Sequence, residues 1–381
     1  MPQHSGTVEV NMRVLMTGGG TGGHVNPALA IANTIMENEP DSEIAFVGTE
    51  RGIENKLVPK AGYELFHVNV MGLRRSLSLS NIKAAYLALT SPGKAKKIIK
   101  KFKPDVVIGT GGYVSWPVVK AAAEMGIPTA LHESNAVPGM AVRMLSGAVD
   151  RIYLNFEVAG SGISQKEKLM VCGCPLLGKP AEITKEAARE KLGIAQDAVY
   201  VLSYGGSMGA EKVNEAVLEV MKNVTGGAEG VVHTHATGAI EKDTCFRQFE
   251  EAGLKAHENL ELLEYIYDMP TRLAAADVVI CRAGAMTVSE LAMTGKCAIF
   301  IPSPNVTDDQ QFKNASVLSA KDAAIVIREN SDTPEILCEK LKELIENGDA
   351  RREMEEKILE FSRPDANKII YNDIVELIKN K

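Results

Sequence analysis

The sequence lacks the features of a membrane-spanning chain, a disulfide-linked domain or a metalloprotein. No apolar run reaches the roughly 18 residues that a spanning helix needs. The 6 cysteines are scattered, without the paired Cys-x-x-Cys spacing of a zinc site, and no His-Glu-x-x-His or Asp-x-Asp motif occurs. The polar N-terminus does not look like a secretory signal. We therefore expect reduced thiols, no metal, no cofactor and a protein that stays in the cytoplasm.

Charge is unevenly distributed along the chain. The net charge is −7, but residues 1–176 carry a net +4 and residues 177–381 a net −11. Between residues 74 and 104 there are nine basic residues and no acidic ones, with apolar residues between them. We expect residues 73–103 to lie on an anionic membrane surface, although an amphipathic helix with a solvated lysine face explains the pattern equally well. The acidic total and the lack of a recognised motif argue against nucleic acid.

Apolar, β-branched runs alternate with helical patterns, which predicts an α/β fold of doubly wound parallel sheets covered on both faces. A chain of 381 residues exceeds what one core usually supports, so we expect two Rossmann-like domains. The Gly- and Pro-rich segment 172–180 marks the join. The first domain is then 1–175 with a C-terminal helix at about 362–381, and the second is 176–361. We expect the two domains to face a central cleft. The predicted strands are 13–16, 43–47, 64–68, 105–108, 129–132, 151–154, 169–171, 199–203, 230–234, 260–263, 277–281, 297–301 and 323–327.

Two glycine-rich turns, 18–24 and 205–209, each follow a predicted strand and open a predicted helix. Such a turn leaves backbone N–H groups free at the positive end of a helix, which favours a phosphate. Two turns predict two phosphate-bearing ligands, or one long ligand between the domains. The first matches G-x-G-x-x-G, with Asn26 and Pro27 as its expected helix start. No acid ends the second predicted strand, however, so a nicotinamide or flavin enzyme is the weaker reading.

In the first half of the chain, the candidate catalytic residues are polar side chains at the ends of predicted strands. His24 follows the first glycine turn and can take a proton from an attacking hydroxyl, although it could also simply cap the turn. His132 and Glu133 end another strand and form either a second proton-accepting pair or a buried hydrogen-bonded pair. The turn at 109–115 supplies further donors.

In the second half, Ser207 and its neighbouring amides are expected to hold a diphosphate. Glu290 lies one turn into a predicted helix, where it could accept the hydroxyls of a ribose or close a capping box. Segment 308–314 offers amides and carboxylates for sugar hydroxyls. Without a metal, the charge of a leaving diphosphate must be met by amides, hydroxyls and cations such as Arg282.

Six motifs in one order resemble the MurG family of glycosyltransferases (family 28): 19–27, 111–115, 132–135, 205–210, 284–290 and 309–311. The resemblance covers nearly the whole chain. It implies a GT-B fold, with the acceptor on the N-terminal half and the UDP-sugar mostly on the C-terminal half. Donor contacts are then expected at Thr21, Gly22, Gly23, Asn135, Ser207, Ile266, Ala285, Met286, Thr287, Val288, Ser289, Glu290, Gln310 and Gln311. Phosphate and acceptor contacts are expected at Gly19, Gly20, Gly111, Gly112 and Tyr113.

The resemblance also implies a reaction and a place. UDP-N-acetylglucosamine would donate its sugar, with inversion and without a metal, to the 4-hydroxyl of undecaprenyl-diphosphate-linked muramyl-pentapeptide in peptidoglycan synthesis. His24 is the expected base, and His132 with Glu133 the competing one. The chain would work at the cytoplasmic face of the membrane, with other cell-wall synthesis proteins as candidate partners.

Two departures from the family pattern stand out. Leu177 replaces the arginine of a Gly-Asn-Pro-Val-Arg motif that contacts the nucleotide, and Trp116 replaces a usual glycine. Either another cation such as Arg282 substitutes for the missing one, or this contact is not needed in this chain. Three alternatives stay open: a glycosyltransferase of the same architecture acting on diacylglycerol or a small aglycone, a UDP-sugar epimerase, and a membrane-binding module without activity.

Overall fold

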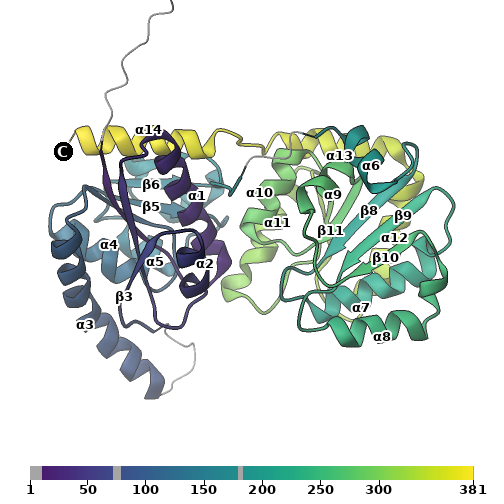
Figure 1. The fold of residues 1–381 in the computed structure, drawn as a ribbon, viewed down its shortest axis with the longest axis horizontal. Helices are drawn as coiled ribbons and strands as arrows, with labels where there is room; N and C mark the ends of the chain where they lie inside the picture. Colours follow the sequence, from purple (N-terminus) through teal and green to yellow (C-terminus); the bar gives the residue numbers. More distant parts are fainter. Residues whose placement is uncertain (1–10, 72–78, 179–182, 381) are drawn as a thin grey trace, which may run out of the picture. The chain divides into compact units, whose positions relative to one another are not determined.

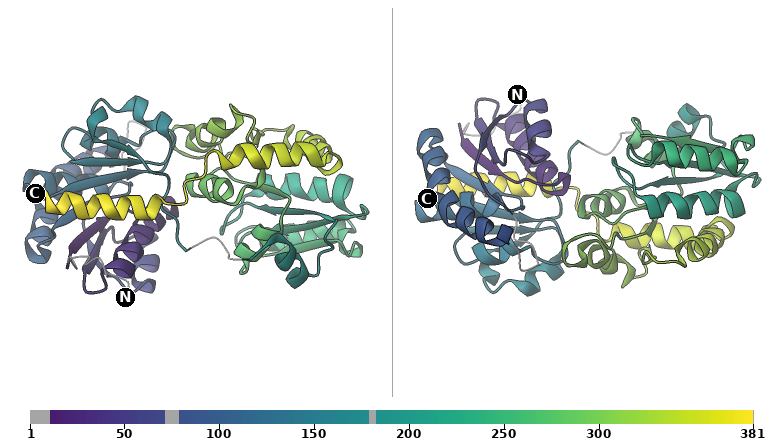
Figure 2. Two further views of the ribbon diagram at one scale, coloured as in Figure 1. Left: turned by 90° about the horizontal axis from the view of Figure 1, so that it is seen from above. Right: turned by 90° about the horizontal axis from the view of Figure 1, so that it is seen from below.

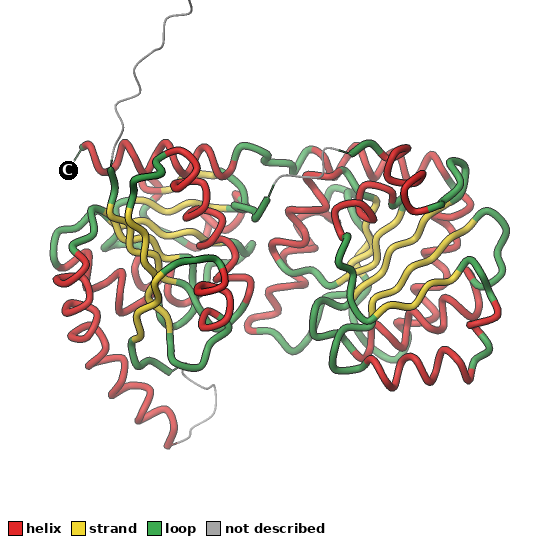
Figure 3. Tube along the Cα trace, in the orientation of Figure 1, coloured by secondary structure: helices red, strands yellow, loops and turns green. Residues whose placement is uncertain are grey.

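The computed structural model describes residues 11–71, 79–178 and 183–380, with the side chains of 79–89 left outside that description. The chain divides into two compact units, residues 1–178 with 363–381, and residues 179–362 (Figure 1). Each unit has its strands inside and its helices outside (Figure 3). In the described part of the chain, no helix has the length and apolar character needed to cross a bilayer.

The N-terminal unit contains a seven-stranded parallel sheet in the order β3-β2-β1-β4-β5-β6-β7. Its strands are β1 (Arg13–Thr17), β2 (Glu43–Gly48), β3 (Glu64–His67), β4 (Val106–Gly109), β5 (Thr129–Glu133), β6 (Arg151–Leu154) and β7 (Leu169–Val171). Its helices are α1 (Gly22–Asn38), α2 (Glu54–Lys60), α3 (Leu79–Phe102), α4 (Ser115–Glu124), α5 (Met140–Leu145), α14 (Ala366–Lys379) and the short η1 (Glu157–Gly162) and η2 (Lys166–Lys168).

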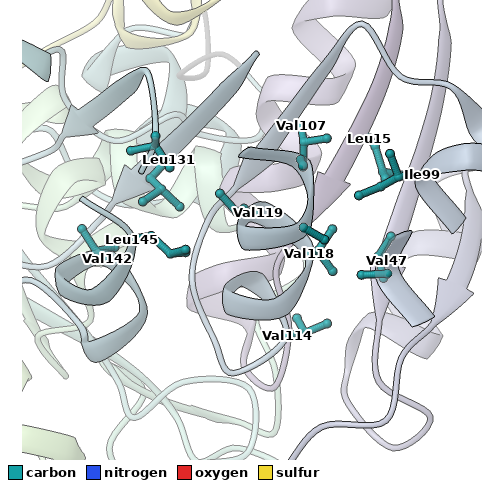
Figure 4. Packing of buried hydrophobic residues seen from close by; sticks show 14 of the residues in the cluster. Leu15, Val47, Ile99, Val107, Val114, Val118, Val119, Leu131, Val142 and Leu145 are labelled. Atoms are coloured by element: carbon teal, nitrogen blue, oxygen red, sulfur yellow. The ribbon is translucent and has the colours of Figure 1, made fainter. Parts of the chain in front are cut away.

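Two apolar layers cover the faces of this sheet. Alternate residues of β1, such as Leu15 and Met16, point into different layers, as the two-residue period of a strand requires. The Leu15 layer packs against α3, α4 and α5 (Figure 4). The Met16 layer packs against α1 and α14, so the last helix of the chain completes the first unit (Figure 2). The Asp373 carboxylate fixes α14 by accepting hydrogen bonds at 2.8 Å from Arg151 Nε and Tyr153 Oη.

The C-terminal unit repeats the design with six parallel strands in the order β10-β9-β8-β11-β12-β13. The strands are β8 (Val199–Tyr204), β9 (Val231–Ala236), β10 (Leu260–Leu263), β11 (Val278–Cys281), β12 (Cys297–Phe300) and β13 (Ile325–Val326). The helices are α6 (Lys185–Leu192), α7 (Glu211–Val220), α8 (Lys242–Glu251), α9 (Met269–Ala275), α10 (Ala285–Thr294), α11 (Gln310–Ser319), α12 (Thr333–Glu346), α13 (Gly348–Leu359) and the short η3 (Met221–Thr225), η4 (Leu254–Ala256) and η5 (Thr307–Asp309).

The strand order decides where ligands can bind. In both sheets the order reverses beside the first strand, between β1 and β4 and between β8 and β11. Loops that leave neighbouring strands in opposite directions open a crevice at the carboxyl edge. The prediction of two doubly wound parallel sheets is confirmed, and each predicted strand is present. Two short helices, α2 and α8, were not predicted.

A buried histidine pair joins β8 to β9 inside the second unit. The Ser203 hydroxyl lies 2.9 Å from His233 Nε2 and 2.9 Å from His235 Nδ1. Thr225 and Asn214 contact the remaining ring nitrogens at 3.0 and 3.1 Å. Burial lowers the pKa of His233 to about 3 and that of His235 to about 4, so both rings are neutral at pH 7.

This pair predicts loss of stability in mild acid. The folded rings titrate below the ordinary value of 6.5, so the unfolded chain binds more protons as the pH falls from about 6.5 toward 4. At pH 5 each histidine then lowers the free energy of unfolding by about 2 kcal/mol. Urea unfolding at pH 7 and pH 5 measures this loss, which should be smaller for His233→Gln than for the unmodified chain. Equal pH dependence of the two proteins would contradict the expectation.

Candidate functional site

The turn after β1 places free amides at the carboxyl edge of the N-terminal sheet. The structure begins α1 at Gly22, with Thr21 as its N-cap, and not at Pro27 as predicted. The Gly22 and Gly23 amides therefore lie in the first helical turn, where N–H groups have no intrahelical partner and can meet an anion. The earlier start brings predicted ligand-binding residues into the helix terminus itself.

A buried carboxylate that the sequence did not reveal organises this turn. Glu54 Oε2 accepts a hydrogen bond from the Gly20 amide at 2.9 Å. Glu54 Oε1 accepts from the amide and the hydroxyl of Thr49 at 2.9 and 2.8 Å. Burial works against the charge, but these bonds outweigh it and hold the pKa of Glu54 below its ordinary value. The Gly20 amide therefore already has an acceptor within the protein, whereas no such partner occupies the Gly22 and Gly23 amides among the described contacts.

His24 is held with one ring nitrogen toward the protein. Its Nδ1 lies 3.1 Å from the Gly19 carbonyl oxygen and 3.3 Å from Thr21 Oγ1. A carbonyl can only accept, so in the neutral ring the proton sits on Nδ1 and Nε2 is left as an acceptor. Burial lowers the pKa of His24, against opposing effects of the Gly19 carbonyl and the Glu54 charge. His24 is therefore neutral at pH 7, with Nε2 as its hydrogen-bond acceptor.

The turn after β4 packs directly on the first turn. Gly111 and Gly112 have φ of +109° and +80°, where side chains are strained. A Cβ on Gly112 would overlap the Gly19 carbonyl oxygen, and one on Gly111 would lie 2.5 Å from His24 Cδ2. The Gly111 amide donates to Ser115 Oγ at 3.1 Å, so this amide also has an acceptor within the protein. Tyr113 is 61% exposed at the tip of this turn.

His132 and Glu133 are buried at the end of β5 and support its turn. His132 Nε2 lies 3.1 Å from the Gly173 carbonyl oxygen, and Nδ1 lies 3.3 Å from Ser134 Oγ. Burial lowers the pKa of His132 to about 4. Glu133 accepts from the Asn135 amide and side chain at 2.9 and 3.1 Å and from the Gly139 amide at 2.7 Å. Burial raises the pKa of Glu133. These contacts favour the structural alternative for the pair, with Asn135 held in place by Glu133.

The glycine turn after β8 is fastened to the turn after β9. The Ser207 carbonyl accepts from the Ala239 amide at 3.2 Å, and the Met208 carbonyl accepts from the Ile240 amide at 3.1 Å. Gly209 has a φ of +90° and lies so close to Thr237 that a Cβ would overlap its carbonyl oxygen. Ser207 itself is exposed at this edge.

A cavity of about 360 Å³ opens beside this turn. Its walls carry hydrogen-bond donors and both signs of charge, contributed by Gly205, Gly209, Ala210, Glu211, Lys212, Arg282, Ser303, Asn305, Gln311 and Glu329. Arg282 forms a 2.5 Å ion pair with Glu329 and donates to the Ile301 carbonyl at 3.0 Å. Its charge is thus already paired, which weakens its expected role as the substitute cation.

Lys212 is a second cation on this wall and was not predicted. It lies in the first turn of α7 and pairs with Glu215 at 2.7 Å on the exposed side of the helix. This hydrogen bond to Glu215 raises the pKa of Lys212 and keeps it charged.

Helix α10 carries the longest predicted run of donor contacts. Gly284 is its N-cap, so Thr287, and not Glu290, occupies the capping-box position, which rules out the capping alternative for Glu290. Glu290 is exposed, whereas Val288 is buried and can offer only backbone atoms. Ala285, Met286, Thr287 and Ser289 are half-buried. Ile266, in the turn after β10, is likewise buried.

The turn before α11 has an unusual backbone. Asp308 and Asp309 both have left-handed conformations, with φ of 56° and 53°. Consecutive non-glycine residues of this kind are strained and tend to occur at functional sites. Asp309 pairs with Arg328 at 3.2 Å, and the Gln311 side-chain oxygen accepts from the Ser303 amide at 2.9 Å. Gln310 begins the helix beside this turn.

The basic stretch is only partly described. Residues 72–78 and the side chains of 79–89 lie outside the description, so Arg74, Arg75 and Lys83 have no structural account. In the rest of α3, Ala95, Ile99 and Phe102 are buried, while Lys94, Lys97, Lys100 and Lys101 are exposed, as is Lys103 just after the helix. The described part is therefore an amphipathic helix with a solvated basic face.

The remaining expectations concern the family departures and a metal. Leu177 is exposed, and Trp116 packs against the apolar layer of α3 and α4. Over the described ranges, no group of three or more His, Cys, Asp or Glu side chains is arranged to hold a metal ion.

Comparison with known proteins gives matches over most of the chain. Residues 14–154 match the glycosyltransferase family 28 N-terminal domain, and residues 200–370 match the glycosyltransferase family 28 C-terminal domain. A curated relative from Acetivibrio thermocellus is 41% identical over 97% of this chain and 99% of its own length. It is named UDP-N-acetylglucosamine--N-acetylmuramyl-(pentapeptide) pyrophosphoryl-undecaprenol N-acetylglucosamine transferase.

Solved structures resemble the chain over a similar extent. MurG of Acinetobacter baumannii aligns with a TM-score of 0.78 and 28% identity, covering 95% of this chain and 99% of that one. A putative UDP-N-acetylglucosamine 2-epimerase from Listeria monocytogenes aligns with a TM-score of 0.67 but only 14% identity, covering 97% of this chain and 98% of that one. The second likeness is one of fold alone.

The contact between Gly111 and His24 predicts the effect of adding one methyl group. Gly111→Ala should destabilise the protein by about 1–3 kcal/mol through backbone strain and also displace the His24 ring. Gly126→Ala is a matched control, because Gly126 also has a positive φ, +74°, but has open space around its Cβ position. Nitrogen NMR of labelled histidines, with His24 assigned from its loss in His24→Ala, compares the two variants. Identical His24 signals in both variants would show that the predicted displacement does not occur.

Proposed function

The chain belongs to glycosyltransferase family 28, and from that premise we propose that it transfers N-acetylglucosamine from UDP-N-acetylglucosamine to undecaprenyl-diphosphate-linked muramyl-pentapeptide. Full-length similarity to a relative named for this reaction supports the substrate pair. The observation that carries the chemistry is the neutral His24 ring, whose Nδ1 faces the Gly19 carbonyl and whose Nε2 is left as a proton acceptor.

The reaction is a single displacement at the anomeric carbon of the donor. The muramyl 4-hydroxyl oxygen forms the new bond to this carbon while the bond to the UDP oxygen breaks, so an α-linked donor gives a β-1,4 product. His24 Nε2 takes the hydroxyl proton as the oxygen attacks. His132 is the weaker candidate for this role, because both of its ring nitrogens contact protein atoms in a buried site.

The second unit supplies most of the donor contacts in this proposal, and Thr21, Gly22, Gly23 and Asn135 of the first unit supply the others. Its cavity takes the diphosphate, whose growing charge meets the amides of the turn after β8 and the cations of the wall. The backbone of Ile266 meets the uracil and Glu290 accepts the ribose hydroxyls. The strained turn ahead of Gln310 and Gln311 faces the sugar, with Gln311 fixed by its bond to Ser303.

The proposed acceptor carries a lipid chain, so we expect the reaction to take place at a membrane surface. The exposed lysines of α3 form a cationic helix face that can lie against anionic headgroups. We place the protein as a peripheral protein on the cytoplasmic face of the membrane, where its acceptor is anchored. The exposed Tyr113 lies at the edge of the N-terminal sheet, where the acceptor is expected.

A transfer assay tests the proposal directly. Radiolabelled UDP-N-acetylglucosamine is supplied with the lipid-linked muramyl-pentapeptide, with diacylglycerol, or with no acceptor. We expect a labelled lipid product and UDP release in the first arm alone. Transfer to diacylglycerol would support the related glycosyltransferase instead. Conversion of the donor without acceptor would indicate an epimerase, whose fold this chain shares.

The charge on Lys212 predicts a diphosphate-specific loss of donor affinity. Lys212→Gln should weaken UDP binding about 3- to 10-fold, because it removes one cation from the cavity wall, and should leave uridine binding unchanged. Lys222→Gln is a matched control, since Lys222 also pairs with a glutamate three residues away but does not line the cavity. Calorimetric titration of each variant with UDP and with uridine measures the two affinities. Equal losses for UDP and uridine, or for the two variants, would exclude the assignment.

A further inference from the structure

Glu54 and His24 are joined through one peptide group. The amide of Gly20 donates to Glu54 Oε2 at 2.9 Å, and the carbonyl of Gly19 lies 3.1 Å from His24 Nδ1. The Gly20 N–H and the Gly19 C=O belong to the same planar peptide unit. The order of contacts is therefore carboxylate, peptide N–H, peptide C=O and imidazole N–H.

Three glycines make room for the carboxylate in this arrangement. A Cβ on Gly19 would lie 2.7 Å from Glu54 Oε1, and one on Gly48 would lie 2.6 Å from Glu54 Cγ. A Cβ on Gly52 would overlap the carboxylate itself. Glu54 is fully buried, and its two oxygens accept three hydrogen bonds, so the group is fixed from several sides. The glycine-rich turn thus encloses an internal anion at the position where a bound phosphate was expected.

We propose that Glu54 is a positioning residue for His24: through the peptide between Gly19 and Gly20 it fixes the imidazole with its proton on Nδ1 and Nε2 free to accept. That Nε2 takes its proton from the hydroxyl of the muramyl sugar rests on the proposed function. The positioning itself rests on geometry. An anion on the N–H side polarises the peptide and strengthens its carbonyl as an acceptor, because linked hydrogen bonds reinforce one another. It also prevents this peptide from rotating, which would remove the acceptor from Nδ1.

The test is a double-mutant cycle on the full chain. Glu54→Gln removes the charge and turns one of the two acceptor oxygens into an NH2 donor, so the Gly20 amide either loses its acceptor or keeps an uncharged one that polarises the peptide less. In the unmodified background kcat should fall 10- to 100-fold, while the KM for UDP-N-acetylglucosamine changes less than 3-fold. In the His24→Ala background the same substitution should change kcat less than 3-fold, because the positioned group is already absent. Equal losses in both backgrounds would overturn the proposal and indicate a general structural role.

A control and an activity-independent readout complete the experiment. Glu39→Gln alters another glutamate of this unit, one that accepts a hydrogen bond from Tyr371 at 2.8 Å near the far end of α1, and should leave kcat unchanged. Nitrogen NMR of labelled histidines reports the tautomer of His24 directly. We expect the Nδ1-protonated form in the unmodified chain and a mixture of tautomers in Glu54→Gln. An unchanged tautomer would overturn the positioning role, whereas absence of transfer by the unmodified chain would count against the proposed function alone.

Discussion

Parallel pairing of every strand is the constraint on which the rest of this structure depends. Because both sheets are entirely parallel, every loop that follows a strand emerges at the same edge. The reversal of strand order beside β1 and beside β8 then separates neighbouring loops and leaves a crevice between them. The glycine turns, His24, Glu54 and the donor cavity all lie at these edges. Within each unit, the parallel topology therefore brings residues that are distant in sequence to one edge of the sheet.

Within the first unit, two turns at the carboxyl edge of the sheet pack backbone against backbone. The turns after β1 and β4 touch at Gly19 and Gly112, a contact that leaves no space for a side chain. The Gly111 backbone of the turn after β4 lies against the His24 ring, and the Gly19 carbonyl of the turn after β1 lies beside its Nδ1. The neutral state of His24 follows from burial, which lowers its pKa, and its tautomer follows from the Gly19 carbonyl beside Nδ1. The turn after β1 therefore holds the His24 ring in one orientation.

In the second unit, several buried charged side chains are paired with opposite charges. Arg282 and Glu329 form a paired wall of the cavity, and Asp277 accepts from the amide of Tyr200 at 2.6 Å while pairing with Lys185 at 2.5 Å. Pairing removes the cost of burying single charges, but it also limits what such residues can offer a ligand. The exposed Lys212 differs in this respect, since its partner Glu215 lies on the solvent side of the helix. The two cations that line this cavity, Arg282 and Lys212, are therefore not interchangeable.

The sequence by itself determined the fold class, the strands and the order of the site motifs. Strand and helix periods, glycine turns and their spacing are local properties, so residues near one another in the chain are enough to reveal them. Tertiary structure alone decided the contacts of Glu54, Lys212, His132 and Arg282. Helix α2, which carries Glu54, is short and contains Pro59, so its pattern gave no helix signal. A hydrogen bond between Glu54 and Gly20, or an ion pair between Arg282 and Glu329, joins residues whose proximity arises only when the sheets assemble. Which amide is free, which cation is paired and which histidine keeps an open nitrogen all depend on such partners.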